Sequence, residues 1–455
     1  MRHSLKLLAR VLAAGCAAVL AINAAAAQSI LRDAETEALF RDMSAPIVKA
    51  AGLEPQNVSV VLVGDRSINA FVVNGQAVYL NAGLIESADS ANQVQGVIAH
   101  ELGHITGGHA ISGEQAGKSA GTISILSLLL GAAAAVAGAG EAGMAAMMAG
   151  QSAAMGKYLA FSRVQESQAD AAGAKYLSGA GISGRGSIEF FRKLENEGYK
   201  RGYSQTDQDV FLSTHPLEGD RIATLKDVYE KDPAWTRPSD PALEERFRRI
   251  KAKLYGYLAE PHETLAAYPL SDTSVPAHYA RAYAFHKEAF LDKAITETEA
   301  LLTKAPADPY FLELKGQILL EAGKPAEALA TLRRATDLSG NSPLIATTFG
   351  HALIATENRA NLAEAQRVLK TAVARDRDNP TAWYQLGVVY AQTGDTARAQ
   401  LASAEQQVLN GRWAEARSSA ETAAAQLPKE TPDWLRAQDI ALQARGEIER
   451  KKKRK

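Results

Sequence analysis

Apolar and polar positions in the first part of the chain predict a helix followed by a small sheet. Residues 30–52 carry apolar residues at helical spacing and end at a glycine, so we predict an amphipathic helix there. Residues 58–85 contain short β-branched runs, two of them separated by Asn74 and Gly75. Because Asn-Gly between apolar runs is a strong hairpin signal, we predict a small antiparallel β-sheet in this segment.

A long apolar stretch lies further along the chain. Thr122–Gly140 contains no charged residue over 19 positions, which is long enough to cross a membrane. Its second half is almost entirely Ala and Gly, which contribute little transfer free energy. Two interpretations stay open, membrane association and a buried or mobile hairpin, and the composition favours the hairpin. Residues 158–198 then predict two helices separated by SGAGISGRG.

The C-terminal part of the chain repeats a two-helix unit. If units start at Val275, Pro309, Pro343 and Pro380, they are spaced by 34, 34 and 37 residues. The eighth position of each unit is then a small residue: Ala282, Gly316, Gly350 and Gly387. This is the tetratricopeptide period, in which small residues let the two helices cross closely. Residues 275–440 therefore predict an α-solenoid, with an irregular helical bundle as the alternative.

The segments on either side of the repeats differ from them in composition. Residues 233–274 combine a Pro-rich patch with a charged helical run, so we predict a linker helix region. Residues 441–455 end in KKKRK and are predicted to form a basic tail. A run of this kind is usually solvated and disordered, and binding to anionic lipid head groups is the alternative.

The first 27 residues have the layout of a secretory signal peptide. A basic start with Arg2, Lys6 and Arg10 precedes a short apolar run and an Ala-x-Ala site that ends at Ala27. We therefore expect the mature protein outside the cytoplasm, in a bacterial periplasm. Cys16, the one cysteine of the chain, lies inside this segment, and its lipidation is the less favoured alternative. Removal of the segment would leave no thiol for a disulfide or a Cys-ligated zinc.

Overall composition limits the class of partner. Hydrophobic residues make up 46% of the chain and the formal net charge is −1, which is typical of a globular protein with two or three domains. Removal of the signal peptide takes away three basic residues and shifts the net charge to about −4. This balance gives no support for a nucleic-acid partner.

Candidate chemistry concentrates in the sequence VIAHELGHITGGHA at residues 97–110. His100 and His104 are four residues apart on a predicted helix, so both imidazoles project from one face and can bind two corners of a tetrahedral zinc. Glu101 lies about 100° around the helix from His100, where it can take a proton from a water activated by the metal. An ordinary exposed helix face is the alternative, but the apolar residues on both sides disfavour it.

A third protein ligand has three candidates. His109 is one position short of the spacing HExxHxxGxxH, so we predict a surface or loop histidine rather than a ligand. Glu166 and Asp170 are four residues apart among small residues, where a second helix can pack closely. One of these carboxylates can bind zinc while the other accepts a ring N–H from a ligand histidine, and two solvated acids are the alternative.

His215 is the third candidate. It precedes a proline at a predicted helix start, which holds an imidazole rigidly. This position suits a fourth zinc ligand or a donor to the oxyanion formed at the scissile carbonyl. A lone histidine is usually neither.

Three motifs in this order, HELGH, FSRVQESQAD and STHPLEGDRI, resemble the zinc metallopeptidase clan of HtpX and the CAAX prenyl proteases. With its signal peptide and repeats, the chain is similar to the periplasmic BepA-like (YfgC-like) branch of that clan. The resemblance implies a mainly α-helical gluzincin-type domain with a small β-sheet over residues 28–232, and one zinc ion (Zn2+) per chain.

The resemblance also implies residue roles. It makes Glu101 the general base and Asp170 the acid behind a ligand histidine, and gives zinc three ligands: His100, His104 and Glu166. His215 matches a histidine that can take the fourth zinc position and keep the enzyme latent. INAFVV at 68–73 matches a strand beside the cleft, where Asn69 and Ala70 would bind an extended substrate by main-chain pairing. The Pro-Gly-Gly that follows this strand in the family is Val-Asn-Gly here.

The function implied by the resemblance is quality control of the outer membrane. We expect a zinc-dependent endopeptidase that cleaves unfolded or misassembled outer-membrane proteins, with the repeats recruiting substrate or the β-barrel assembly machinery. The alternative is a periplasmic chaperone or adaptor for outer-membrane protein assembly, with a mostly latent zinc site closed by His215. Peripheral membrane contact and a membrane-embedded protease that spans at 122–140 are weaker alternatives.

Overall fold

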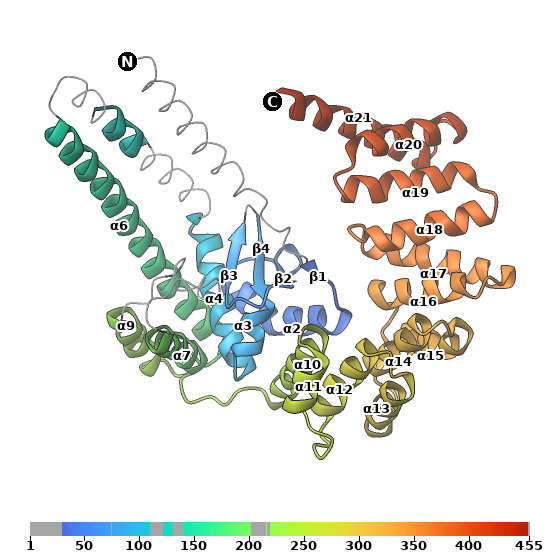
Figure 1. Ribbon diagram of the computed structural model, residues 1–455, viewed down its shortest axis with the longest axis horizontal. Coiled ribbons are helices and arrows are strands. Elements are labelled where there is room, and N and C mark those ends of the chain that lie inside the picture. The colour runs from blue at the N-terminus through green and yellow to red at the C-terminus, as the bar shows by residue number, and fades with distance from the viewer. Residues whose placement is uncertain are drawn as a thin grey trace, which may run out of the picture. The chain divides into compact units, whose positions relative to one another are not determined.

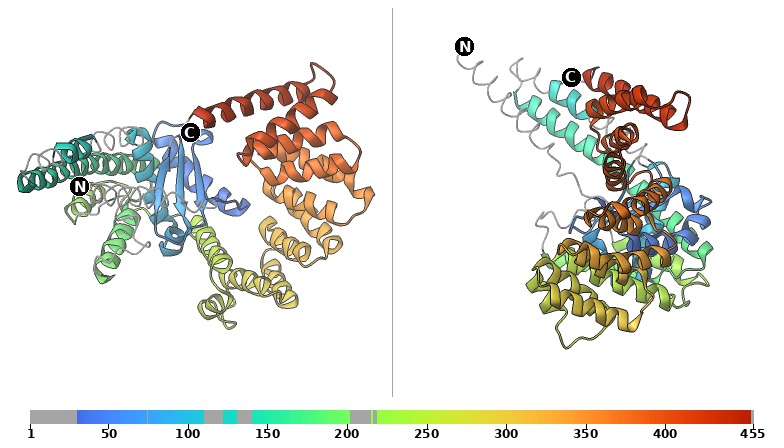
Figure 2. Two further views of the ribbon diagram at one scale, coloured as in Figure 1. Left: turned by 45° about the horizontal axis from the view of Figure 1, so that its top comes forward. Right: turned by 90° about the vertical axis from the view of Figure 1, so that its right-hand side faces the viewer.

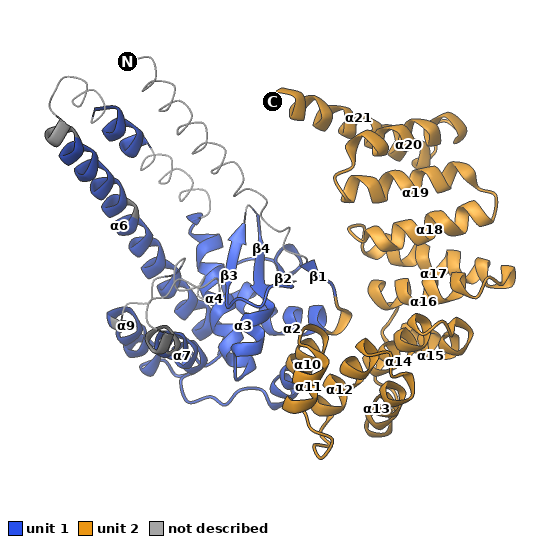
Figure 3. Cartoon of the chain, in the orientation of Figure 1, with its two compact units in different colours: residues 1–32, 36–248 blue, residues 33–35, 249–455 orange. Residues whose placement is uncertain are grey.

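The computed structural model of the 455-residue chain describes residues 30–73, 75–109, 122–130, 140–201, 215 and 219–453. The expected signal peptide with Cys16, the hairpin residue Asn74 and positions 131–139 of the apolar stretch lie outside the described residues. The chain divides into two compact units (Figure 3). The first contains residues 36–248 with the N-terminal residues up to Arg32, and the second contains residues 33–35 and 249–455.

A four-stranded mixed sheet lies in the first unit (Figure 1). Its strands have the spatial order β1-β2-β4-β3 and are β1 (Ile30–Leu31), β2 (Ser59–Val63), β3 (Ala70–Val73) and β4 (Ala77–Asn81). β3 and β4 pair antiparallel around Gly75, which has a φ of 131°, as the predicted hairpin requires. β1 and β2 are also antiparallel, but β2 and β4 are parallel. The prediction of an antiparallel sheet is therefore wrong for the central pair.

The connection after β2 explains this parallel pair. The chain passes the end of β4 before β3 begins, so that β3 pairs on the far side of β4. The Gly83 amide donates to the Asp65 carbonyl at 3.0 Å, and the Asn81 side chain donates to Ser67 Oγ at 2.9 Å. A Cβ at Gly83 would lie 2.1 Å from the Arg66 carbonyl oxygen, so only glycine lets the connection pack on α3 (Ala82–Ser87). Strand periodicity contains no information about these contacts.

Two helices of the first unit carry the sequence motifs. α4 (Ala91–Thr106) begins after Ser90, whose side chain accepts a hydrogen bond from the Gln93 amide. α6 (Gly140–Ala180) packs against α4 through small residues. A Cβ added at Gly103 would lie 2.6 Å from the Ala169 carbonyl oxygen, and one at Gly173 would lie 3.1 Å from the carbonyl carbon of Ala99. The expectation that a second helix packs on the small residues around Glu166 is confirmed.

Four more labelled elements belong to the first unit, and the last two of them contact this helix pair. They are α2 (Ala34–Ala50), η1 (Pro55–Asn57), α7 (Arg185–Arg201) and α9 (Gly219–Glu230). The predicted break at SGAGISGRG separates α6 from α7, but α6 begins at Gly140, well before the predicted start at residue 158. Within the described ranges, no helix combines the length and apolar character needed to cross a membrane.

The second unit contains the predicted repeats. It begins with α10 (Pro241–Leu258), which continues from the first unit, and α11 (Pro261–Ala267). Five helix pairs follow: α12 (Val275–Lys287) with α13 (Leu291–Lys304), α14 (Pro309–Glu321) with α15 (Pro325–Leu338), α16 (Pro343–Ala355) with α17 (Leu362–Arg375, preceded by η2, Arg359–Asn361), α18 (Pro380–Gln392) with α19 (Thr396–Leu409), and α20 (Trp413–Gln426) with α21 (Pro432–Lys453). The first helices of four pairs begin at the predicted unit starts. Two of the small eighth positions make close contacts, since a Cβ would lie 2.4 Å from the Leu332 side chain at Gly316 and 2.6 Å from the Leu369 side chain at Gly350.

The end of the chain differs from its prediction. The segment expected as a disordered basic tail continues α21 as far as Lys453, and its last described residues are exposed. Four basic residues lie in the last turn of this helix, where they interact favourably with the negative end of the helix dipole. This interaction gives a physical reason for the helix to continue.

Residues 33–35 belong to the second unit through a buried ionic cluster. Glu35 is 2% exposed and accepts hydrogen bonds from Arg249, from Lys253 Nζ at 3.3 Å and from the Tyr279 hydroxyl at 2.7 Å. Lys253 also donates to Asp33 at 2.5 Å. Since a buried carboxylate is tolerated only when it is paired, these contacts fix the start of α2 in the second unit.

We expect Gly103→Ala to destabilise the first unit. The added methyl group meets backbone atoms of Ala169 rather than a flexible side chain, so α4 and α6 must separate, at about 1–3 kcal/mol of unfolding free energy. Gly156→Ala in α6 is the matched control, because its Cβ meets no atom within 4 Å and alanine stabilises a helix interior by roughly 0.5–1 kcal/mol. Urea unfolding measures both variants, and wild-type stability of Gly103→Ala would contradict the packing argument.

Candidate metal centre

Four buried side chains converge on one point of the first unit. His100 and His104 come from α4, Glu166 comes from α6, and His215 precedes α9. One ligand atom of each residue lies within 4.8 Å of the ligand atoms of the other three. The structure thus brings together side chains that are far apart in sequence into a group that can hold a metal ion.

The distances between the donor atoms match a tetrahedral zinc site. His100 Nε2 lies 3.1 Å from His104 Nε2, and 3.3 Å from both His215 Nδ1 and Glu166 Oε2. Glu166 Oε1 lies 3.4 Å from His104 Nε2 and 3.0 Å from His215 Nδ1. Ligands that each lie about 2.1 Å from a tetrahedral zinc are about 3.4 Å from one another. The donor types therefore suit this ion, and five of the six pairs of residues lie close to this spacing.

Glu101 provides a second observation that fits a metal site. Its side chain is fully buried, and neither carboxylate oxygen has a hydrogen-bond partner among the described residues. Oε1 lies 3.5 Å from His215 Nε2. A buried carboxylate without a partner is unfavourable, and a water molecule in the site would supply the missing contact. A buried carboxylate that can accept a proton from a water molecule at this point is placed as a general base needs to be.

Asp170 and Arg221 contact two of these four side chains, His100 and Glu166. His100 Nδ1–H donates to Asp170 Oδ1 at 2.9 Å, which leaves Nε2 facing the other donors. Arg221, on α9, donates to both oxygens of Asp170 and pairs with Glu166 Oε2 at 3.0 Å. Its guanidinium therefore compensates the charge of both acids. The sequence interpretation missed Arg221, although the residue lies in the motif STHPLEGDRI.

The charges in the cluster stabilise one another. Burial lowers the pKa of an imidazole, but hydrogen bonds to Asp170 and Glu166 outweigh it and raise the pKa of His100 to about 10. Burial raises the pKa of a carboxyl group, yet the three histidines hold the pKa of Glu166 well below its usual range. For His104 burial dominates and lowers the pKa. The two acids thus stabilise a positive charge at this point, either a proton or a metal ion.

His109 differs from its prediction as a surface or loop histidine. Its side chain is buried, with Nδ1 at 3.0 Å from His104 Nδ1 and Nε2 at 3.2 Å from Gln168 Oε1. The chain leaves α4 at Gly107, and Gly108 adopts a φ of 64°, so the His109 ring folds back over Gly107. His109 therefore contacts the ring nitrogen of His104 that faces away from the cluster and orients that ring. Helical spacing could not indicate this, because the helix ends before residue 109.

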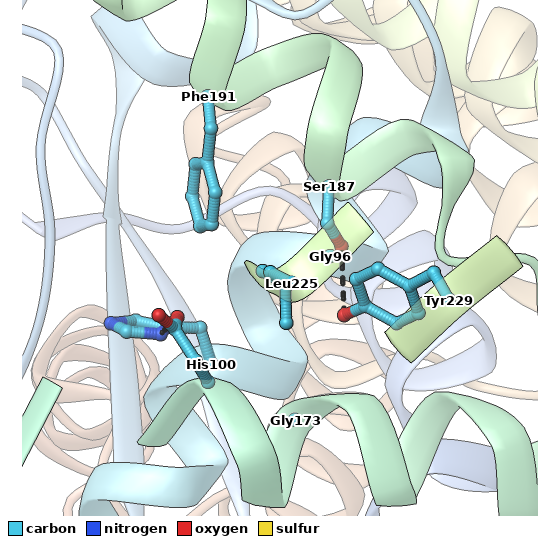
Figure 4. Close-up of a pocket in the computed structure, with 8 residues that line it drawn as sticks. Gly96, His100, Gly173, Ser187, Phe191, Leu225 and Tyr229 are labelled. Atoms are coloured by element: carbon cyan, nitrogen blue, oxygen red, sulfur yellow. Dashed lines mark hydrogen bonds and ion pairs between the residues drawn. The ribbon is translucent and has the colours of Figure 1, made fainter. Parts of the chain in front are cut away.

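Apolar side chains form a wall beside His100 (Figure 4). Phe191 from α7 meets the His100 ring edge-on, with ring centroids 6.1 Å apart. Leu225 and Tyr229 from α9 complete this wall, and the Tyr229 hydroxyl donates to Ser187 Oγ at 3.4 Å. Close packing here restricts rotation of the His100 ring and keeps water from its flank.

The two residues expected to bind substrate lie at the start of β3. Ala70 is the first residue of this strand, and β3 is at an edge of the sheet. Asn69 precedes it, is 7% exposed, and has a side-chain oxygen without a hydrogen-bond partner among the described residues. β3 also packs against α4, the helix that carries His100. Edge position leaves one side of the strand available for main-chain pairing.

Comparisons with known proteins agree with this division of the chain. The model of peptidase family M48 matches residues 31–229, and the model of the tetratricopeptide repeat matches residues 279–343 and 357–407. The beta-barrel assembly-enhancing protease of Escherichia coli (strain K12) is 26% identical over 376 residues, which cover 80% of this chain and 74% of that protein. The protein of the same name from Yersinia pestis is 24% identical, with coverage of 78% and 72%.

One solved structure matches part of this chain. The tetratricopeptide protein YrrB, described as having an unusual peptide-binding site, covers 38% of this chain and 91% of its own, with 22% identity and a TM-score of 0.32. The expected fold, a mainly helical metallopeptidase domain followed by tetratricopeptide helices, is confirmed by the two family matches and by the helices described above.

We expect Asp170→Asn to weaken zinc binding by about 10–100-fold, because the carboxylate that orients His100 and pairs with Arg221 is replaced by a neutral amide. Asp227→Asn is the control, since Asp227 is an exposed acid on α9. Competition for zinc with a chelator measures the affinity of both variants. Equal affinities would show that Asp170 does not support the metal ligands.

Proposed function

We propose that the chain is a zinc-dependent endopeptidase of the bacterial periplasm. The match of residues 31–229 to peptidase family M48 makes it a metalloprotease, and the proposal adds the metal, the type of cleavage and the compartment. The proposal rests on one observation above all. Three histidines and a glutamate converge beside the buried carboxylate of Glu101, which accepts no hydrogen bond from the described residues. We assign one zinc ion per chain to His100, His104 and Glu166.

Each residue of the site has a chemical role in this proposal. A bound zinc ion would act as a Lewis acid on the attacking water and the scissile carbonyl. Glu101 takes a proton from that water and passes it to the leaving amine, a role favoured by its burial and by the absence of a hydrogen-bond donor to it among the described residues. Asp170 holds the His100 ring in the tautomer that leaves Nε2 free to bind.

We assign two roles to His215, which the same imidazole can fill in turn. At rest it occupies the fourth ligand position, consistent with the 3.3 Å between its Nδ1 and His100 Nε2. After it moves aside for a substrate, its N–H can donate to the oxyanion that forms at the scissile carbonyl. His215 is therefore a regulatory ligand as well as a catalytic residue in this proposal.

We further propose that an extended substrate pairs with the outer edge of β3. Asn69 and Ala70 stand at the start of this strand, and β3 packs against the helix that carries the histidines. Pairing through the main chain accepts many sequences, since it reads the backbone and not the side chains. This suits a protease whose substrates share an unfolded state rather than a sequence.

The proposed substrates are unfolded or misassembled outer-membrane proteins. Two relatives are named beta-barrel assembly-enhancing proteases, which supports this choice. The tetratricopeptide helices offer a surface that can recruit a substrate or the β-barrel assembly machinery. The signal-peptide pattern of residues 1–27 supports export to the periplasm.

A second candidate function is favoured by the position of His215. A fourth protein ligand closes a zinc site, as in structural zinc sites. The chain would then act mainly as a chaperone or adaptor for outer-membrane protein assembly through its repeats, with a latent protease site.

We expect Glu101→Gln to retain zinc but to cleave an unfolded protein about 10²–10⁴-fold more slowly, because the amide cannot accept the proton of the attacking water. Glu189→Gln, an exposed position on α7, is the control. Metal analysis and cleavage of β-casein measure both properties. Undiminished cleavage by a zinc-loaded Glu101→Gln variant would overturn the assignment of the base.

We expect His215→Ala to raise cleavage of the same substrate several-fold, since removal of the fourth ligand opens the site. His262→Ala, which changes an exposed histidine in the second unit, controls for the loss of an imidazole. A rate that does not change favours the adaptor function. A fall in the rate would instead make the oxyanion contact the dominant role of His215.

A further inference from the structure

An exposed apolar arm extends from the helix that carries Glu166. It consists of the helix over 122–130 and the first part of α6, residues 140–157 (Figures 1 and 2). The two helices contact one another, because a Cβ at Gly150 would lie 2.1 Å from Ser127 Cβ. Five apolar residues of the shorter helix are nevertheless exposed: Ile125, Leu126, Leu128, Leu129 and Leu130. An apolar surface of this size normally has a partner.

A stripe of apolar side chains runs along α6 toward the metal centre. Met144, Met148, Met155 and Leu159 are exposed by 62%, 67%, 59% and 38%, and we call them the methionine stripe. At about 100° per residue, all four lie within about 40° of Glu166 around the helix axis. Met155 is about 16 Å from Glu166 along that axis. The methionine stripe therefore lies on the face of α6 that leads to the metal centre.

The composition of the arm indicates which partner it fits. Four of the six methionines of the chain lie in residues 140–157. Methionine is flexible and polarisable, and it is common on surfaces that bind varied apolar sequences. Helices that lie in a membrane interface instead combine a polar face rich in Lys or Arg with an opposite face of Trp, Phe or Leu. Residues 122–156 contain no Lys or Arg, and Lys157 is the one basic residue of the arm, so the basic face of such a helix is missing although leucines are present.

We propose that the methionine stripe binds apolar segments of unfolded polypeptides and presents the adjoining bonds to the metal centre. This inference rests on the proposed endopeptidase function and names the feature of the substrate that is recognised. An extended chain covers about 16 Å with five residues, so a segment bound at Met155 places a bond about five residues away beside Glu166. Exposed apolar segments distinguish an unfolded protein from its folded form, which gives the site its selectivity.

A binding experiment tests this without any cleavage. The triple variant Met144→Gln, Met148→Gln and Met155→Gln is made in the Glu101→Gln background, and its Kd for reduced, carboxymethylated α-lactalbumin is measured by fluorescence anisotropy. We expect the Kd to rise at least about tenfold, the change expected from losing one buried apolar side chain. The matched control replaces three exposed apolar residues elsewhere, Val228, Leu270 and Leu442, with glutamine. All six positions are exposed, so circular dichroism and zinc content should match the parent.

A kinetic experiment separates this inference from the proposed function. With Glu101 intact, the methionine triple variant should have a raised KM for the same unfolded protein. Hydrolysis of a peptide too short to reach Met155 from the metal centre should not change. If the parent cleaves neither substrate, the proposed function fails, while the Kd result still decides whether the stripe binds polypeptide.

Three results would overturn the inference. The first is an unchanged Kd, or a rise no larger than that of the control triple. The second is stripe-dependent sedimentation with phosphatidylethanolamine–phosphatidylglycerol vesicles while polypeptide binding is intact, which would make the arm a membrane contact. The third is a self-associated state in light scattering that the methionine substitutions abolish while polypeptide binding is intact, which would make a second copy of the chain its partner.

Discussion

The close approach of α4 and α6 is the constraint on which the metal centre depends. Backbone meets backbone where Gly103 faces Ala169 and where Gly173 faces Ala99. This contact brings the two histidines of one helix to within 3.3–3.4 Å of the Glu166 carboxylate of the other. Larger side chains at the crossing would separate the helices by more than a coordination bond tolerates. The small residues within and beside the motifs are thus as necessary to the site as its histidines and acids.

Electrostatics add a second requirement to this packing. Three histidines, Glu166 and Asp170 are buried together, which is favourable only because Arg221 and the ring N–H groups satisfy both acids. Glu101 stands apart, since its buried carboxylate has no hydrogen-bond partner among the described residues. Folding alone does not favour such a group, and the role of general base that we propose for Glu101 would account for its presence. Stability and reactivity are thus assigned to different acids within one small volume.

Much of the fold follows from local patterns. The α4 helix, the β3–β4 hairpin and the repeat starts at Val275, Pro309, Pro343 and Pro380 are all at or near their predicted positions, because each depends on spacing within a short segment. The predictions are wrong where contacts between residues distant in sequence determine strand pairing or the start of a helix. β2 pairs parallel with β4 because the connection packs under Gly83, and α6 extends back to Gly140 although no amphipathic pattern marks its start.

The candidate site divides in the same way. The spacing of His100 with His104, and of Glu166 with Asp170, by itself determined that each pair lies on one helix face, since the helical repeat fixes that angle. Only the tertiary structure decided that the two faces meet, that Arg221 bridges both acids and that His109 folds back onto His104. The spacing of residues within one helix predicts none of these contacts. The helical repeat sets the directions in which side chains project from one helix. Only tertiary packing decides which other elements those side chains contact.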